Sequence, residues 1–409
     1  MQTPPTAAKP SAADSSTTGR SSPLALVVAL FLVSVNLRPT LISLGPVLDS
    51  VQASLGLSET AIGFLITLPV LCFGAFAPLT PGLLRYLSAE RIILLAMVGL
   101  VGGIILRSLF GTTGLVAGTI VAGACIAVIM VLVPAIIKRN FPMQASMMMG
   151  LYSTALCLGA AVAAGVTVPI KDLPGSNWRL ALAFWLVPVL VAVVTWLPHV
   201  PKADGDASRR RPPLPRLRSN LLAWQVTMHM GLQSAVAYCL FGWLPFILID
   251  RGLSQVTAGL VLSACMGIQL ITSLSGPWLA TRGKDQRLVI AIMLAMTLTG
   301  LMGCFYAPLS QIWGWSLLMG LGLGGVFSIA LALLVLRAPN APVAAALSGM
   351  AQGVGYTIAA TGPFVLGLLH ELTGGWDAVA AFFAFLIISG GFFGMGAGRA
   401  RYIKTDPAS

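Results

Sequence analysis

The sequence predicts an all-α polytopic membrane protein, and three observations lead to this fold class. Hydrophobic residues make up 57% of the 409 residues and charged residues only 9%, whereas soluble domains carry roughly 25% charged residues. The mean hydropathy is +0.91. Charged and turn residues divide the chain into twelve apolar runs, each close to the ~20 residues that cross a bilayer as a helix.

The predicted transmembrane helices follow one another with short connections. In chain order they cover residues 23–49, 60–84, 92–110, 113–137, 144–170, 180–198, 221–249, 256–280, 288–306, 313–336, 343–369 and 377–397.

These spans divide the chain into two halves of six helices with polar flanks. The expected segments are a disordered cytoplasmic N-terminal tail (1–22), an N-terminal six-helix half (23–198), a basic cytoplasmic linker (199–220), a C-terminal six-helix half (221–397) and a cytoplasmic tail (398–409).

A cleaved signal peptide is the alternative interpretation of residues 1–45. It fits poorly, because Asp14 precedes the apolar run and no A-x-A site follows it. We therefore expect the first apolar run to remain in the protein as a transmembrane helix.

The distribution of Lys and Arg predicts the orientation in the membrane. Of 24 such residues, nineteen fall in the segments that lie inside if the N-terminus is cytoplasmic, four fall at outer ends, and Arg38 falls in a span. Because cytoplasmic loops hold the excess of Lys and Arg, both termini are expected in the cytoplasm. The run RRRPPLPRLR (209–218) is then an inner loop; no aromatic residues interleave it, so we expect no nucleic-acid partner.

An internal repeat supports the two halves. Six residues that frame the second helix recur around the eighth at a constant offset of 196 positions: Leu57, Ser58, Gly63, Pro81, Leu83 and Arg91 match Leu253, Ser254, Gly259, Pro277, Leu279 and Arg287. Parallel halves of this kind place a substrate at their interface, near the bilayer midplane.

Arg38 is the most informative residue of the sequence. It lies near the centre of the first span, roughly 3 Å from the midplane at 1.5 Å per residue, where a charge costs at least about 2.5–3.5 kcal/mol. All twelve acids lie in tails, loops or helix ends, so no carboxylate is available at this depth. Arg38 could bond to the Val35 carbonyl that Pro39 frees, or could bind a small anion as a fork-shaped donor.

Other polar residues share this depth and form the rest of the candidate substrate site. Each could instead join helices together. The predicted substrate-binding residues are Asn36, Arg38, Gln233, Ser234, Tyr238, Gln269, Gln352 and Tyr356, with Tyr152 about 7–8 Å inward of its helix centre.

Two further residues are candidates for gating or coupling. Arg107, at an outer helix end, is expected to snorkel to the interface or to close a gate. His229 lies toward the cytoplasm, and packing or gating suits it better than a proton relay.

The sequence gives no sign of catalytic residues, a metal site or a cofactor. All six cysteines fall inside spans, and the three histidines are far apart. The GLGLGG run (Gly320–Gly325) matches a dinucleotide fingerprint but lies inside an apolar helix without a preceding strand, which favours close helix packing. Disulfides and metal ligands are therefore not expected.

Five segments together resemble the cyanate and 2-nitroimidazole transporter subfamily of the major facilitator superfamily. The resemblance extends over about residues 24–397, and its segments are NLRPTLISLGPVL, LVPAIIKRNFP, GLYSTALCLGAAVAAGVTVP, MGLQSAVAYCLFGWLP and SGMAQGVGYTIAATGP. It implies the major facilitator fold and transport of a small anion or small nitrogen heterocycle through the inner membrane. It also implies that Arg38, Gln233, Gln352 and Tyr356 line the pathway.

Two departures from the superfamily pattern bear on gating and specificity. The loop between the second and third helices, PGLLRYLSAER, has neither the acid nor the glycine of G-x-x-x-D-R-x-G-R-R at the corresponding places. Met130 stands where relatives often carry Asn or Gln, so a particular substrate is not transferred to this chain.

The expected mechanism is alternating access by a monomer, with the lipid bilayer, a small-molecule substrate and a coupled proton or exchanged anion as partners. An inward-moving anion works against the membrane potential, at about 2.3 kcal/mol per charge per 100 mV.

The alternative functions are a drug or multidrug exporter and a non-transporting sensor. An unpaired arginine disfavours export of cations, and a sensor would need an output domain, which the sequence does not show. A membrane enzyme is less consistent with the sequence.

Overall fold

The computed structural model is helical throughout the residues that it describes, which are 22–201, 215 and 217–404. Within them, eleven segments are long and apolar enough to cross a membrane, and a shorter apolar helix, Thr67–Leu83, lies in the predicted second span. The prediction of an all-α polytopic membrane protein is confirmed. The prediction for the N-terminal tail falls almost entirely outside the described residues, and that for the basic linker falls outside them at 202–214 and 216.

The first half of the chain contains several short or interrupted helices. Its elements are α1 (Pro23–Val35), α2 (Pro39–Ile42), η1 (Gly45–Val47), α3 (Leu48–Leu55), α4 (Glu59–Phe76), η2 (Ala77–Leu79), α5 (Thr80–Leu83), α6 (Ala89–Leu109), α7 (Gly111–Asn140), η3 (Pro142–Gln144), α8 (Ala145–Lys171), α9 (Trp178–Ala183), α10 (Leu186–Trp196) and η4 (Leu197–His199).

The second half is built from longer, continuous helices. Its elements are α11 (Leu221–Asp250), α12 (Gln255–Arg282), α13 (Arg287–Tyr306), η5 (Leu309–Gln311), α14 (Ile312–Leu336), α15 (Ala341–Thr373) and α16 (Asp377–Ala397).

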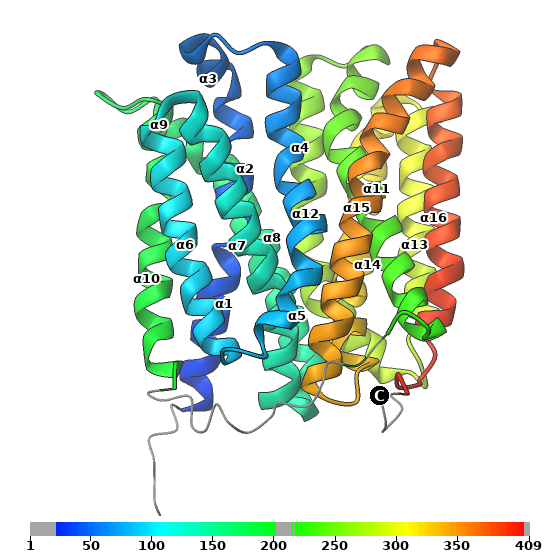
Figure 1. Ribbon diagram of the computed structural model, residues 1–409. Coiled ribbons are helices and arrows are strands. Elements are labelled where there is room, and N and C mark those ends of the chain that lie inside the picture. The colour runs from blue at the N-terminus through cyan, green and yellow to red at the C-terminus, as the bar shows by residue number, and fades with distance from the viewer. Residues whose placement is uncertain (1–21, 202–214, 216, 405–409) are drawn as a thin grey trace, which may run out of the picture.

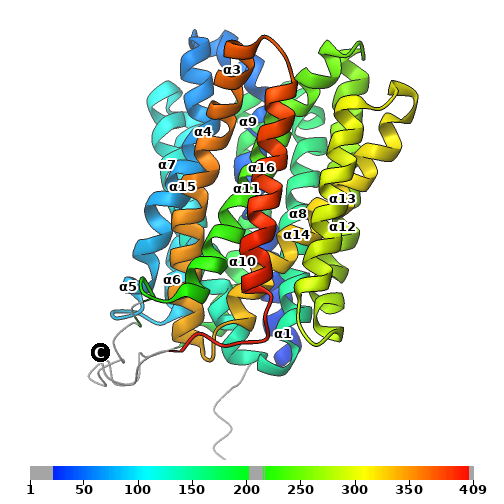
Figure 2. The ribbon, with the colours of Figure 1, turned by 90° about the vertical axis from the view of Figure 1, so that its right-hand side faces the viewer.

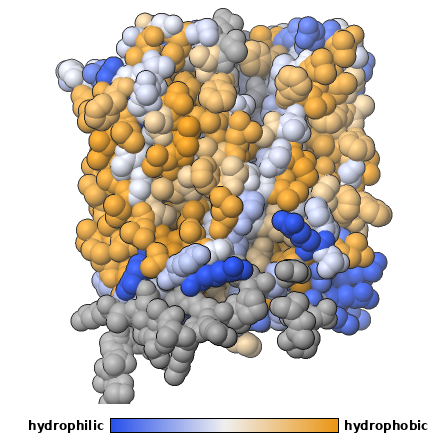
Figure 3. Space-filling view, viewed as in Figure 1, coloured by the Kyte–Doolittle hydropathy of each residue, from blue (hydrophilic) through white to orange (hydrophobic). Residues whose placement is uncertain are grey.

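The helices run side by side between two ends of one bundle (Figures 1 and 2). Helix α1 begins and α16 ends at the same end, the lower one in Figure 1. We call this the inner end, because the distribution of Lys and Arg predicts that it faces the cytoplasm. On the face in view in Figure 3, hydrophobic residues cover most of the middle of the bundle, and hydrophilic ones gather at its two ends, including the inner end. Large side chains such as Phe364 and Phe392 point outward, 75% and 76% exposed, as expected for a surface in contact with lipid.

The repeat seen in the sequence has a local structural counterpart. Ser58 and Ser254, 196 residues apart, are the N-caps of α4 and α12, with backbone angles of −70°, 158° and −66°, 151°. Each side chain accepts a hydrogen bond from the backbone N–H three residues later, at 3.3 and 3.2 Å. The same capping therefore starts the second helix of each half.

Proline interrupts the helices of the first half where the sequence predicted continuous spans. Pro39 has no N–H to donate and its ring clashes with the carbonyl four residues earlier, and α1 ends at that residue, Val35. Pro78 and Pro81 likewise divide the predicted second span into α4, η2 and α5.

Six helices make the main contacts between the halves. Helix α8 of the first half packs against α12 and α14 of the second, and α15 of the second packs against α4 and α7 of the first. The glycine run of α14 serves close packing: an added Cβ at Gly324 would lie 2.5 Å from the Gln269 carbonyl oxygen of α12. The packing interpretation of the GLGLGG run is thus confirmed.

Candidate functional site

The break after α1 sets the position of Arg38. The turn Asn36–Arg38 separates α1 from α2, and Arg38 is the residue that precedes α2. The carbonyl of Val35, which Pro39 leaves without its helical partner, lies against Gly159 of α8, where an added Cβ would collide with it. Gly159 is thus the residue that lets α8 approach the broken helix closely.

The guanidinium of Arg38 has no hydrogen bond or ion pair to any residue that the structure describes. Its Nε is buried without a hydrogen-bond partner. The carbon Cζ lies 5.5 Å from the centroid of the Phe327 ring, which belongs to α14. Among the side chains that the structure describes, Arg38 therefore has no fixed acidic partner, in keeping with the prediction from the absence of nearby carboxylates.

Arg38 lines a cavity between the two halves. The volume in which the centres of water molecules fit is about 60 Å³, and one water needs about 10–15 Å³ of such volume. The cavity therefore has room for a few waters or for a ligand of a few heavy atoms. Six of the predicted substrate-binding residues line it: Arg38, Gln233, Ser234, Tyr238, Gln269 and Tyr356.

The second half contributes neutral polar groups to the cavity. Gln233 Nε2 donates to Ser234 Oγ (2.8 Å) and to the Met230 carbonyl oxygen (3.2 Å). The Nε2 of Gln269 and the hydroxyl of Tyr356 are buried without a hydrogen-bond partner. Two donors beside an unpaired cation form a constellation that suits an anion or an electron-rich polar group.

Sequence reasoning missed the apolar part of the wall. These residues include Phe241, Met266, Phe327, Cys157 and Ala160. Helical spacing from a predicted residue would have found one of them, because Phe241 follows Gln233 by two turns of α11. Nothing in the apolar sequence of α14 marks Phe327.

Three predicted substrate-binding residues lie outside this cavity. Asn36 Nδ2 donates to the carbonyl oxygens of Leu32 (2.7 Å) and Pro188 (3.1 Å) and so ties α1 to α10. Gln352 Nε2 donates to the Met130 carbonyl oxygen (3.0 Å) and so ties α15 to α7. Tyr152 is buried, its hydroxyl lacks a hydrogen-bond partner, and it lines a separate small void within the first half.

The two gate or coupling candidates are buried and bonded to backbone or hydroxyl groups. Arg107 is only 2% exposed and does not extend to the membrane surface, in contrast to the predicted snorkelling. Its guanidinium donates to the Thr40 carbonyl oxygen and to Ser43 Oγ (3.1 Å), at the interrupted part of the first span. His229 Nδ1 lies 2.8 Å from the Gly390 carbonyl oxygen, which ties α11 to α16.

Contacts between the halves close the inner side of the cavity. Ser153 Oγ donates to the Ser273 carbonyl oxygen (2.9 Å), between α8 and α12. An added Cβ at Gly150 would lie 2.7 Å from the Leu274 carbonyl oxygen, so the two backbones meet closely here. Together with the Gln352 bond to α7, these contacts define an inner-closed state.

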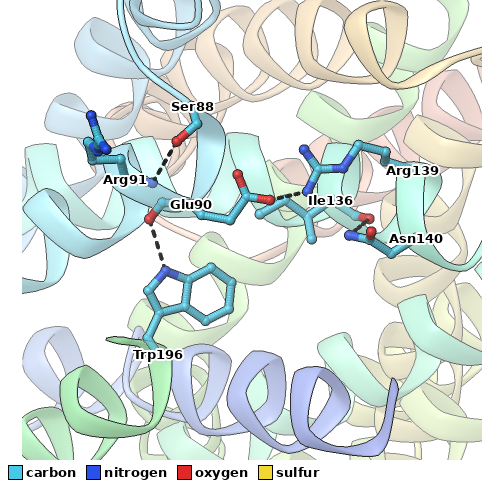
Figure 4. A network of polar contacts seen from close by, with 7 residues as sticks. All are labelled: Ser88, Glu90, Arg91, Ile136, Arg139, Asn140 and Trp196. Atoms are coloured by element: carbon cyan, nitrogen blue, oxygen red, sulfur yellow. Dashed lines mark hydrogen bonds and ion pairs between the residues drawn. The ribbon is translucent and has the colours of Figure 1, made fainter. Parts of the chain in front are cut away.

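A polar network holds the inner end of the first half (Figure 4). Arg139, near the end of α7, pairs with the carboxylate of Glu90 in the first turn of α6. Trp196 Nε1 donates to the Glu90 carbonyl oxygen (2.9 Å) and Ser88 Oγ accepts from the Arg91 N–H (3.4 Å). The stretch PGLLRYLSAER thus carries an acid, Glu90, close to its end, and this acid pairs with Arg139 and joins α6 to α7.

No carboxylate whose side chain the structure describes lines the cavity. In the described parts of the chain, no group of three or more His, Cys, Asp and Glu residues is placed to hold a metal ion. The cavity therefore offers one charge, amide and hydroxyl groups, and aromatic rings.

Comparisons with known proteins identify the family of the chain. The family model described as Major Facilitator Superfamily matches residues 24–360. The chain is 36% identical over 379 residues to the uncharacterized transporter YycB of Bacillus subtilis (strain 168), covering 92% of this chain and 94% of that protein.

Two relatives from Escherichia coli (strain K12) have named substrates. The 2-nitroimidazole transporter is 35% identical over 390 residues, covering 93% of this chain and 97% of that protein. The cyanate transport protein CynX is 28% identical over 364 residues, covering 89% and 94%. The resemblance to this subfamily is confirmed.

The fold is similar to that of a solved transporter. The proton:xylose symporter XylE bound to 6-bromo-6-deoxy-D-glucose superimposes with a TM-score of 0.75 at 13% identity, covering 93% of this chain and 97% of that one. The chain is thus a multi-pass membrane transporter rather than an enzyme, and it belongs to the major facilitator superfamily.

Proposed function

We propose that this protein moves a small anion or small polar nitrogen compound across the bacterial inner membrane by alternating access. The substrate class is cyanate-like or 2-nitroimidazole-like, in keeping with two of the relatives. Arg38 is the central anchor. The single observation that carries the proposal is the guanidinium of Arg38, which faces the cavity with no acidic partner among the described residues.

The chemistry of the cavity supports an anion more than a cation. A buried cation without a counter-ion is costly, and an entering anion lowers that cost by forming charge-assisted hydrogen bonds. Gln269 Nε2 and the Tyr356 hydroxyl, which lack partners, are placed to donate further hydrogen bonds. A lipophilic cation would instead add like charge at the same place, which argues against export of cationic drugs.

The size of the cavity supports a small substrate in this inner-closed state. Room for a few waters suits an ion of three or four heavy atoms such as cyanate. A substituted imidazole needs more space, and outward movement of the cavity walls would have to supply it. We therefore place cyanate first in the tests and nitroimidazoles second.

The predicted substrate residues take different roles in this proposal. Arg38, Gln233, Ser234, Tyr238, Gln269 and Tyr356 contact the substrate. Asn36 and Gln352 act through the helices that they join, α1 with α10 and α15 with α7.

The proposed transport cycle draws on a gradient or on consumption of the substrate. Against an inside-negative potential, import of one anion costs about 2.3 kcal/mol per 100 mV. Because no described carboxylate lines the cavity, a proton would travel on the substrate rather than on an acidic side chain. Exchange for an internal anion is the other source of energy.

The decisive test is uptake of labelled cyanate into proteoliposomes. Native protein should show saturable uptake, and Arg38→Gln should abolish it while keeping the thermal stability of the native protein. Arg282→Gln is the matched control, because this exposed arginine lies near the inner end, over the Trp278 ring. Uptake that survives in Arg38→Gln would contradict the anchoring role of Arg38.

A further inference from the structure

Phe327 faces Arg38 across the boundary between the two halves. It belongs to α14 of the second half, lines the cavity, and its ring centroid lies 5.5 Å from Arg38 Cζ. A cation within about 6 Å of an aromatic centroid is attracted to the electron-rich face of the ring. This contact therefore couples the charge of one half to a helix of the other.

Helix α14 holds Phe327 firmly. Ser328 Oγ donates to the Thr272 carbonyl oxygen of α12 (3.2 Å), and Gly324 lies so close to Gln269 that an added Cβ would be 2.5 Å from its carbonyl oxygen. The backbone that carries the ring is thus fixed to α12, so α14 moves relative to Arg38 only together with α12. Contact between Arg38 and Phe327 consequently depends on how the halves are placed relative to each other.

The aromatic ring suits an anion carrier better than an acidic partner would. A carboxylate would hold Arg38 by a charge-assisted hydrogen bond and would compete directly with an anionic substrate. A ring face offers no hydrogen-bond acceptor of that strength, so it attracts the guanidinium while leaving its donors free. Arg38 Nε accordingly has no hydrogen-bond partner in this structure.

We infer that Phe327 is the resting partner of Arg38 in the empty carrier, where the cation–π contact stabilises the inner-closed state. An anion that binds to Arg38 then supplies the stronger partner. The role of the anion rests on the proposed function, whereas the resting contact is a property of the protein without substrate. The inference can therefore be tested even if the substrate is misidentified.

The test measures the populations of the empty states. Spin labels are attached at Met143→Cys of the first half, which is 95% exposed, and at Lys284→Cys of the second half, which is exposed near the inner end. The full chain, with its six native cysteines replaced by serine, is studied in lipid nanodiscs without substrate. The distance distribution between the labels then separates inner-closed from inner-open molecules.

Phe327→Leu should raise the ratio of inner-open to inner-closed molecules about 2- to 5-fold, since it removes a contact of cation–π strength. Phe327→Tyr, which keeps the ring face, should retain the native ratio. Phe392→Leu, which replaces a lipid-facing ring that is 76% exposed, controls for loss of an aromatic side chain.

A double-mutant cycle separates this coupling from simple packing. In an Arg38→Gln background, Phe327→Leu should cause no further change in the ratio. An equal effect of Phe327→Leu with and without Arg38 would make Phe327 a packing residue and would overturn the inference, as would an unchanged ratio in the single variant. Absence of cyanate uptake by the native protein would instead refute the proposed function. It would leave the spin-label result unaffected, because that experiment uses no substrate.

Discussion

The first transmembrane segment of each half contributes to the cavity in a different way. In the first half, α1 ends at Val35 and Arg38 brings a full charge to the break. In the second half, α11 continues from Leu221 to Asp250 and brings the neutral side chains of Gln233 and Ser234. The repeat offset of 196 residues pairs Arg38 with Ser234, so symmetric positions carry different chemistry.

This difference teaches how a symmetric fold forms an asymmetric site. A charge near the midplane is costly without a partner, and the break places Arg38 at a cavity that has room for a ligand. Neutral amides and hydroxyls need only one or two partners, and a continuous helix supplies these from its own carbonyls, as Gln233 does with Met230. The charged side chain thus lies at a break in a helix, and the neutral donors lie on a continuous helix.

Of the variants that test this comparison, Gly159→Ala in α8 should cause the largest loss of stability and cyanate uptake, because it disturbs the break in the first half. The added methyl group would collide with the Val35 carbonyl oxygen and lie 3.1 Å from Pro39 Cδ, so α1 or α8 must shift. Overpacking of this kind costs about 1–3 kcal/mol. We expect a lower melting temperature of the purified protein and a marked loss of cyanate uptake, because the shift moves Arg38.

Gly165→Ala is the matched control in the same helix. No atom lies within 4 Å of an added Cβ there, so the substitution should leave uptake unchanged and keep or raise the melting temperature. Equal behaviour of the two variants would show that the broken helix is not held by close contact with α8.

Local chemistry predicted which carbonyl loses its partner, although residues 23–49 were expected to form one continuous helix. Pro39 identified the carbonyl of Val35 as the one left unpaired, and α1 does end at Val35. The absence of nearby acids predicted that Arg38 would lack an ionic partner. Both arguments depend on residues adjacent in sequence and on membrane depth, and neither requires knowledge of helix packing.

Orientation around the helix axis was harder to predict than depth. Asn36 lies two residues from Arg38 but faces α10, because successive residues of a helical chain turn by about 100°. Gln352 lies on the same face as Tyr356, yet four residues displace it by about 6 Å along the axis, where it meets Met130 instead of the cavity. Depth alone therefore could not separate residues that line the cavity from residues that join helices.

Apolar wall residues could not be predicted at all from polarity. Phe327 lies in a helix in which nearly every residue is apolar, and the packing of α14 against α12 and against α8 of the first half brings its ring to Arg38. Tertiary contacts decide which of many similar side chains faces the cavity. The charged residue of the site could thus be predicted from the sequence, and the apolar residues that shape the cavity could not.

A smaller effect should follow from Gln269→Ala in the second half. The substitution removes a buried Nε2 that lacks a partner in the empty protein, and a neutral hydrogen bond to substrate is worth about 1 kcal/mol, or roughly 5-fold in affinity. We expect the half-saturating cyanate concentration to rise by that factor with an unchanged maximal rate.

Ser263→Ala is the control for Gln269→Ala, because Ser263 lies on the exposed face of α12 and bonds to the Gly259 carbonyl oxygen. An effect of Gln269→Ala as large as that of Arg38→Gln would contradict the division between a charged anchor and neutral donors. No effect would remove Gln269 from the substrate contacts.

The smallest expected change is in melting temperature, and it compares one acid–base pair at the inner end of each half. In the first half, Glu90 and Arg139 join two helices, whereas in the second half Asp285 bonds within its own loop to Arg287, through Nε (2.7 Å) and the backbone N–H (3.2 Å). The hydrogen bonds from Arg287 lower the pKa of Asp285 below its usual value. Asp285 thus contributes stability at pH values above its ordinary pKa, and that contribution disappears as the pH falls through the lowered pKa.

Because Asp285 is partly exposed and its pair joins no second helix, Asp285→Asn should change the melting temperature at pH 7 by no more than the error of the measurement. It should only flatten the decline of melting temperature below about pH 4. Glu90→Gln should lower the melting temperature at pH 7 measurably, because it leaves Arg139 without the carboxylate that ties α7 to α6. A larger loss in Asp285→Asn than in Glu90→Gln would mean that the second half, despite its continuous helices, relies more on its inner loop than the first half does.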